Sequence, residues 1–120
     1  MDIRNARDIP QLVSEHGEIV QEMFGNAGKN AAAHSLAQIT LPPNTASLKH
    51  YHPIAEESYY ILSGKGRVEI DGESAEMSLG DSVIILAEQV HQIFNDHAEE
   101  LVFLAVCVPA WTPDNSVFLD

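Results

Sequence analysis

The chain has little cysteine, few basic residues and no long apolar run. Its 120 residues include a single cysteine, Cys107, so no internal disulfide can form and a reducing compartment is expected. No apolar stretch reaches the roughly 18 residues that a membrane span needs. The N-terminus also lacks a basic segment followed by an apolar run. These absences predict a cytoplasmic protein with no membrane partner.

Basic residues are also unevenly placed. Six lysines and arginines stand against 18 acidic residues, which gives a net charge of −12, and the last basic residue is Arg67. Such a chain repels a phosphate backbone and has no basic stripe to reverse that repulsion, so nucleic acid is not an expected partner. The length and the 45% hydrophobic content indicate one soluble globular domain.

From His34 onward, short alternating segments are separated by glycine, proline and aspartate turns. Asp71-Gly72, between two of these segments, is a strong hairpin signal. Leu101–Val108 is apolar on both faces, as a central strand would be. The pattern predicts an all-β antiparallel sandwich or barrel. Its strands are expected at 35–41, 46–52, 57–62, 67–70, 74–79, 82–86, 90–94 and 101–108.

The N-terminal residues are the least regular part of the chain. Asp8 is a candidate N-cap for a short helix that has Pro10 in its first turn and ends at Gly17. Residues 18–24 are typical of a short edge strand, and residues 25–28 of a loop. We expect a single domain over 1–120. Its parts would be an N-terminal extension (1–33), a conserved barrel (34–109) and a C-terminal tail (110–120).

The stretch from Lys49 to Tyr60 carries residues typical of a metal site. In an extended strand successive side chains point to opposite faces, so His50 and His52 share one face. Two imidazoles placed in this way can converge on one ion at roughly 2.0–2.1 Å per bond. A carboxylate from the next strand, Glu56 or Glu57, could add a third ligand.

This stretch resembles the first motif of the cupin family, G-x5-H-x-H-x4-E-x6-G. His50, His52, Glu57 and Gly64 match the motif in residue type and spacing, and Asn44 replaces its leading glycine. The six-residue gap before Gly64 therefore favours Glu57 over its neighbour as the acidic ligand. Small single-domain cupins of this conserved-barrel type are often labelled mannose-6-phosphate isomerase-like.

A second cupin motif, G-x5-P-x-G-x2-H-x3-N, should follow a strand and a hairpin later. Gly80, His91 and Asn95 fall on it, while Leu86 and Glu88 replace its proline and second glycine. Two motifs in the right order and at the right distance make a specific match, whereas one H-x-H alone would be weak.

The resemblance covers residues 44–95 and implies a double-stranded β-helix, or jelly roll, with one metal ion deep in the barrel. It also implies that His50, His52, Glu57 and His91 are the metal ligands. Three imidazoles and one carboxylate suit one divalent transition metal ion, Fe, Mn, Ni, Co or Zn. They leave one or two coordination positions for water or a substrate.

Tyr59 is a candidate catalytic residue. If Glu57 points inward, strand alternation also directs Tyr59 inward, where its hydroxyl could reach the site or bond to the backbone instead. Cupin lyases of the dimethylsulfoniopropionate type are similar in placing a tyrosine two residues after the glutamate. Three histidines outside the motifs are expected at the surface or in caps: His16, His34 and His97.

Three classes of function follow from these expectations. The first is a metal-dependent enzyme acting on a small organic metabolite, of dioxygenase, isomerase or lyase type. The second is non-catalytic binding of a sugar or a small carboxylate. A phosphorylated sugar is disfavoured, because Lys49 points away from His50 and no other cation is evident for a phosphate. A transcription regulator is not supported, because the chain lacks an attached helix-turn-helix and has the wrong charge.

A jelly roll with two open sheets must protect its edges. Small cupins are often homodimers, and an exchange of residues Glu18 to Phe24 between two copies would cover such an edge. The alternative is a monomer that folds this segment onto its own barrel.

Overall fold

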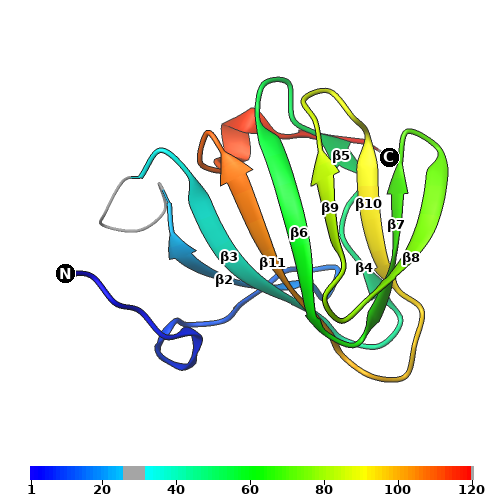
Figure 1. Cartoon of the computed structure of the whole chain (residues 1–120), viewed down its shortest axis with the longest axis horizontal. Helices are drawn as coiled ribbons and strands as arrows, with labels where there is room; N and C mark the ends of the chain where they lie inside the picture. Colours follow the sequence, from blue (N-terminus) through cyan, green and yellow to red (C-terminus); the bar gives the residue numbers. More distant parts are fainter. Residues whose placement is uncertain (26–31, 120) are drawn as a thin grey trace.

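The computed structural model describes residues 1–25 and 32–119. Over these residues, two antiparallel sheets face each other across an apolar core (Figure 1). The first sheet has the strand order β1-β2-β3-β11-β6-β9. Its strands are Leu12–Val13, Ile19–Phe24, Ser35–Leu41, Leu101–Val108, Glu56–Ser63 and Ser82–Ile85, in that order.

The second sheet has the strand order β12-β5-β10-β7-β8, and β4 also pairs with β10. Its strands, with β4 last, are Val117–Phe118, His50–Tyr51, His91–Asn95, Lys65–Ile70, Glu73–Ser78 and Thr45–Ala46. Strands far apart in the sequence are neighbours in both sheets, as in a jelly roll. The predicted all-β, double-stranded β-helix is therefore confirmed.

The core lies between the sheets because the two long central strands alternate strictly. In β6 the buried side chains are Glu57, Tyr59 and Ile61, and in β11 every second residue from Leu101 is buried. Their outward neighbours are half-buried or exposed. Eight core residues of the described chain have no more than 1% of their surface exposed: Leu41, Ala55, Ile61, Ile85, Ile93, Leu101, Phe103 and Cys107.

The strand predicted at residues 46–52 is wrong as a single element, because it is split into β4 and β5. Ser47 lies at the break. Its hydroxyl oxygen accepts a hydrogen bond from Ile93 N at 3.0 Å, and its own backbone N donates to Ile93 O at 2.9 Å. A side chain that occupies a donor of the neighbouring strand in this way competes with regular pairing.

The helix predicted from Asp8 to Gly17 is also wrong. A single 3-10 turn, η1 (Ala6–Asp8), is capped by the Asn5 side chain, so Asp8 ends a turn where it was expected to begin a helix. Leu12–Val13 then forms β1, which pairs with β2 through a turn in which Ser14 N donates to Glu18 O at 2.9 Å.

The edge strand predicted at residues 18–24 is present as β2, but it is not at the edge, because it lies between β1 and β3 of the same chain. The loop predicted at residues 25–28 falls mostly outside the described residues. At the other end, a second 3-10 turn, η2 (Pro113–Asn115), leads into β12, which pairs with β5. No helix in the described part is long and apolar enough to cross a membrane.

Two residues of the cupin motifs, Gly64 and Asn95, have a structural role at the loop between β10 and β11. Gly64 has a φ of +80° at the turn between β6 and β7, and a Cβ there would overlap the carbonyl oxygen of Glu100. The buried Asn95 donates to Leu41 O at 2.9 Å and to Glu99 O at 2.8 Å, and it accepts from His97 N at 3.0 Å. Gly64 therefore lets the loop between β10 and β11 approach the β6–β7 turn closely, and Asn95 fixes this loop by hydrogen bonds.

Candidate metal centre

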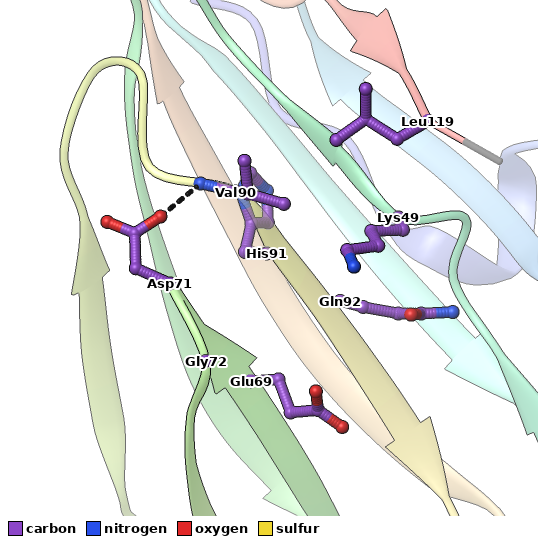
Figure 2. Close-up of a pocket in the computed structure, with 8 residues that line it drawn as sticks. All are labelled: Lys49, Glu69, Asp71, Gly72, Val90, His91, Gln92 and Leu119. Carbon is purple, nitrogen blue, oxygen red and sulfur yellow. Dashed lines mark hydrogen bonds between the residues drawn. The ribbon is translucent and has the colours of Figure 1, made fainter.

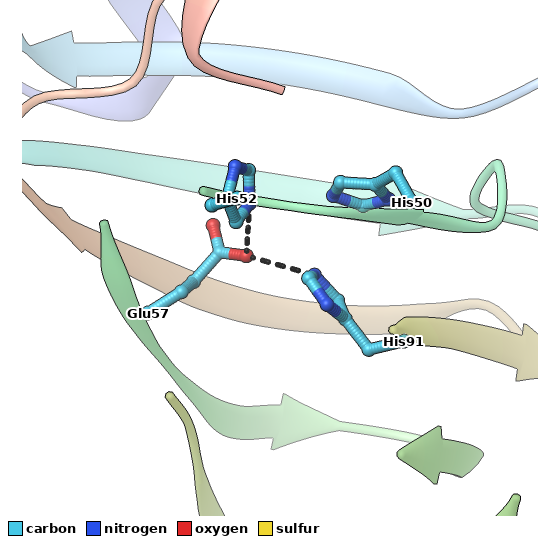
Figure 3. A group of neighbouring side chains, drawn as sticks. All are labelled: His50, His52, Glu57 and His91. Atoms are coloured by element: carbon cyan, nitrogen blue, oxygen red, sulfur yellow. Dashed lines mark hydrogen bonds and ion pairs between the residues drawn. The ribbon is translucent and has the colours of Figure 1, made fainter. Parts of the chain in front are cut away.

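Four side chains from both sheets meet inside the barrel (Figure 3). His50 in β5 and His91 in β10 are register partners in the second sheet, and their ring centroids are 4.2 Å apart. Glu57 points inward from β6 in the first sheet, and His52 lies just beyond the end of β5. The two histidines predicted to share a strand face therefore reach the same point, although the strand ends between them.

The potential ligand atoms of this cluster lie within 4.8 Å of one another. Donor atoms on one ion with bonds of about 2.0–2.2 Å are roughly 3–4 Å apart, so a small contraction would bring the set into coordination distance. The four residues are at most 9% exposed, and His52 and His91 are only 1% exposed. Glu56, the competing carboxylate, is exposed and takes no part in the cluster.

Each of the three imidazoles is oriented by a backbone carbonyl. His50 Nδ1 donates to Leu48 O at 2.8 Å, and His91 Nδ1 donates to Gln89 O at 2.9 Å. His52 Nδ1 donates to Asn115 O at 3.1 Å. A carbonyl can only accept, so the proton is placed on Nδ1 and Nε2 is the nitrogen directed into the cluster. Hydrogen bonds from the outer ring nitrogen to a carbonyl are typical of metal-ligating histidines.

Glu57 is the one anion of the cluster, and it changes the pKa of its neighbours. Its Oε1 lies 3.3 Å from His52 Nε2 and 3.4 Å from His91 Nε2. Burial opposes a charge on Glu57, but the two imidazoles outweigh it and lower the pKa of the carboxyl to about 2. Burial likewise opposes protonation of His52, but the hydrogen bond and the charge of Glu57 outweigh it and raise the pKa of that imidazole.

The carboxylate of Glu57 has less effect on the pKa of His50 than on that of His52. Burial first, and the charge of His91 next, lower the pKa of His50 to about 4, which keeps its imidazole neutral near pH 7. A neutral imidazole is the form that binds metals.

His91 Nε2 supplies a test of whether a metal fits. This atom is buried and has no hydrogen-bond partner of good geometry among the described residues. A buried polar atom without a partner is costly, and an ion at the centre of the cluster would satisfy it. With its three Nε2 atoms and one carboxylate, the cluster has the donor set of a transition-metal site, and it could hold a metal ion.

Tyr59 points inward beside Glu57, as strand alternation predicted. It is buried, and its ring centroid lies 6.3 Å from that of His91 and 4.8 Å from that of Phe103. Burial, followed by the charges of Glu57 and Glu18, raises the pKa of its hydroxyl well above the usual value. The catalytic role of Tyr59 stays a prediction.

Sequence reasoning missed Glu18. Val20 pairs with the inward-facing Ile39, so the same alternation, continued to the residue before β2, directs Glu18 inward. Burial raises the pKa of Glu18, His16 opposes this at 3.4 Å, and the charge of Glu57 adds to it. Parity places residues 18, 20 and 22 on one face, but only the register of β2 against β3 shows that this face points inward. His16 is therefore half-buried beside this carboxylate, whereas the other two histidines outside the motifs are exposed, as expected: His34 and His97.

A pocket of about 440 Å³ adjoins the cluster at the second sheet, because His91 is one of the residues that line it (Figure 2). Lys49, Glu69 and Gln92 line it, and the last two are register partners that point away from the core. Lys49 therefore lines a pocket that His91 also lines, although it is not one of the four cluster residues. Burial of Cys107 raises the pKa of its thiol to about 12 and makes it unreactive.

Comparison with known proteins agrees with this fold and cluster. The cupin domain family matches residues 37–107, and the chain belongs to this family. An uncharacterized protein of Methanocaldococcus jannaschii is 29% identical over 112 residues, which cover 93% of this chain and 90% of the relative. An oxalate-binding protein of Thermotoga maritima is 27% identical over 113 residues, which cover 90% of this chain and 93% of the relative.

Among solved structures, a cupin from Silicibacter pomeroyi described as a sugar phosphate isomerase superposes with a TM-score of 0.81. The match covers 99% of this chain and 82% of the other, at 21% identity. At that identity the likeness shows the fold alone.

Proposed function

We propose that the protein binds one divalent transition metal ion through His50, His52, Glu57 and His91, and a small organic ligand beside it. One observation supports this proposal. The three imidazoles converge with Nε2 directed into the cluster, and in each ring Nδ1 already donates to a backbone carbonyl. Four protein ligands leave one or two positions for oxygen donors of a ligand. We further propose that the protein is an enzyme of dioxygenase, isomerase or lyase type.

The bound ion would supply Lewis-acid or oxygen-activating chemistry. The protein's own contribution is a buried site that excludes bulk water and a tyrosine hydroxyl beside it. The raised pKa of Tyr59 keeps this hydroxyl protonated at neutral pH, so it can donate a hydrogen bond to a ligand oxygen. Tyr59 would thereby orient the ligand and hold a proton that the reaction can use.

A small carboxylate is the ligand class that we favour. The relative from Thermotoga maritima is described as an oxalate-binding protein, and it aligns over most of both chains. Lys49 lines a pocket together with His91 but is not part of the four-residue cluster, so the cluster itself supplies no fixed cation for a phosphate. Non-catalytic binding of such a carboxylate, or of a sugar, is the second candidate function.

Metal content is the first test. We expect about one equivalent of iron, manganese, nickel, cobalt or zinc per chain after purification without chelator, and the loss of that metal in His52→Ala. His34→Ala, which removes an exposed histidine, is the matched control and should keep the metal. Failure of the wild-type protein to take up any of these ions, even on reconstitution, would refute the proposal.

Ligand binding is tested by calorimetry with oxalate. We expect binding to the metal-loaded protein and none to the metal-free protein. Tyr59→Phe should retain the metal but bind or convert the ligand about 10- to 100-fold less well, since one hydrogen bond to a charged group contributes about 1.5–3 kcal/mol. An unchanged affinity and an unchanged turnover in Tyr59→Phe would remove Tyr59 from the site.

A further inference from the structure

The C-terminal strand β12 brings an aromatic ring next to the metal centre, and Figure 1 shows this end of the chain passing beside β5. Phe118 pairs with His50 across the second sheet, so both side chains point to the inner face. Their ring centroids are 5.5 Å apart at an interplanar angle of 34°, which is within the range of aromatic contacts. Phe118 therefore lies beside the four-residue cluster, on the side of His50.

Phe118 differs in its exposure from the other apolar side chains next to the ligands. It is 51% exposed, whereas Ile85 and Cys107, which pair with Glu57, are each 1% exposed. β12 is the outermost strand of its sheet, so no further strand of the described chain lies beyond the ring. His50, its neighbour, is also the most exposed of the four ligands, at 9%. An apolar surface left open beside a buried polar cluster is typical of a ligand site.

The other inner-face neighbours of the ligands are apolar as well. Three of the ligands lie in strands, and each register partner of these three is either another ligand or an apolar residue. The apolar partners are Phe118, Ile70, Ile85 and Cys107. A sugar would bring several hydroxyl groups to these side chains and leave them without hydrogen-bond partners, which is costly in a buried site. An apolar substituent would instead remove surface of Phe118 from water, which is favourable.

We propose that Phe118 is a specificity-determining residue, and that the ligand at the metal is a short monocarboxylate with an aliphatic or aromatic substituent. The carboxylate would bind the ion, and the substituent would cover the ring of Phe118. This inference rests on the proposed binding of a small carboxylate at the metal, and it specifies the part of that ligand which does not touch the ion. Oxalate has no apolar part, so it would bind the ion without using Phe118.

Calorimetry with the metal-loaded protein and a series of 2-hydroxy acids tests the proposal. The acids from glycolate to 2-hydroxypentanoate present the same two oxygens to the ion and differ only in their apolar chain. We expect the affinity to increase about two- to fourfold with each added methylene, since full burial of one methylene corresponds to about fourfold. This gain should disappear in Phe118→Ala. Phe118→Leu, which keeps an apolar side chain, should restore it in part.

Val117→Ala is the matched control. Val117 belongs to the same strand, but it pairs with Tyr51 and points to the opposite face of the sheet. Its truncation also removes apolar contacts of β12, yet it should leave the gain along the series as in the wild-type protein. Circular dichroism and metal content, which do not depend on the length of the ligand, show whether each variant is folded.

The outcomes separate this inference from the proposed function. Binding of glycolate with no gain along the series, or a gain that survives in Phe118→Ala, would overturn the role of Phe118 and leave metal-dependent binding intact. A gain that is lost equally in Val117→Ala would also overturn it, because the effect would then belong to β12 as a whole. Failure of every 2-hydroxy acid to bind the metal-loaded protein would overturn both the proposed ligand class and the role of Phe118.

Discussion

The two histidines of the H-x-H motif differ in the pKa of their side chains, and Glu57 is the cause. For His50, burial and the neighbouring imidazoles lower the pKa from 6.5 to about 4, a difference of about 3 kcal/mol in favour of the neutral form. His52 is at least as buried, yet its pKa is raised, because its Nε2 lies 3.3 Å from the Glu57 carboxylate. His50 therefore shows the direction in which burial and neighbouring imidazoles move the pKa at this site when the carboxylate contributes little.

Glu57→Gln removes the charge and keeps the shape of the side chain. In the metal-free protein we expect the pKa of His52 to fall from above 6.5 to below it, towards the value of about 4 at His50. The assay is a titration of the imidazole ¹⁵N signals by NMR between pH 4 and 8. Glu56→Gln, at the exposed neighbouring carboxylate, is the control and should leave His52 unchanged.

This prediction has a consequence for stability and for metal binding. A raised pKa of His52 stabilises the metal-free fold below pH 6.5, and this contribution is lost as the pH rises through the folded-state pKa. A metal must displace the same proton, so metal affinity should increase with pH until His52 is neutral. A wild-type pKa below 6.5 for His52, or one that is insensitive to Glu57→Gln, would refute the reasoning.

Three further predictions concern stability, and urea unfolding of the metal-free protein checks them. Because the pKa of His50 is lowered in the fold, its neutral form stabilises the fold above pH 6.5. The free energy of unfolding should therefore fall by up to about 3 kcal/mol between pH 6.5 and 4, and His50→Gln should lack this part of the pH dependence. Asn95→Ala should cost about 2–4 kcal/mol, because it removes three hydrogen bonds from a buried side chain; a loss below 1 kcal/mol would contradict that account. Gly64→Ala should cost more than about 2 kcal/mol, whereas Gly72→Ala, which has a similar φ but open space, should cost about 1 kcal/mol; equal effects would mean that the overlap with Glu100 is relieved.

The spacing of residues within the two motifs predicted most of the candidate metal site. The positions of His50, His52, Glu57 and His91 in two motifs predicted a cluster that the structure brings together within 4.8 Å. The six-residue gap to Gly64 favoured Glu57 over Glu56, and in the structure Glu57 is buried and Glu56 exposed, because one step along a strand reverses the face. The choice of ligands came from the resemblance to the two cupin motifs, whereas strand periodicity by itself predicted only that His50 and His52 share a face.

Features that depend on contacts between distant segments could not be predicted. Ser47 splits its strand through a bond to Ile93, 46 residues later, and nothing near Ser47 signals that partner. The helix expected at Asp8 failed because Leu12–Val13 finds a partner strand in β2, and tertiary pairing then overrides local capping signals. Glu18 was missed because its inward direction follows from the register of β2 against β3.

The C-terminal residues are joined to the metal centre through His52. The Nδ1 atom of this ring lies 3.1 Å from Asn115 O and 3.0 Å from Ser116 Oγ, and Leu119 N donates to Lys49 O next to His50. An ion that fixes the ring of His52 would therefore also restrict the fluctuations of this segment. Amide hydrogen exchange at residues 115–119 should slow when metal is added, so the end of the chain would report the occupancy of a site buried at its centre.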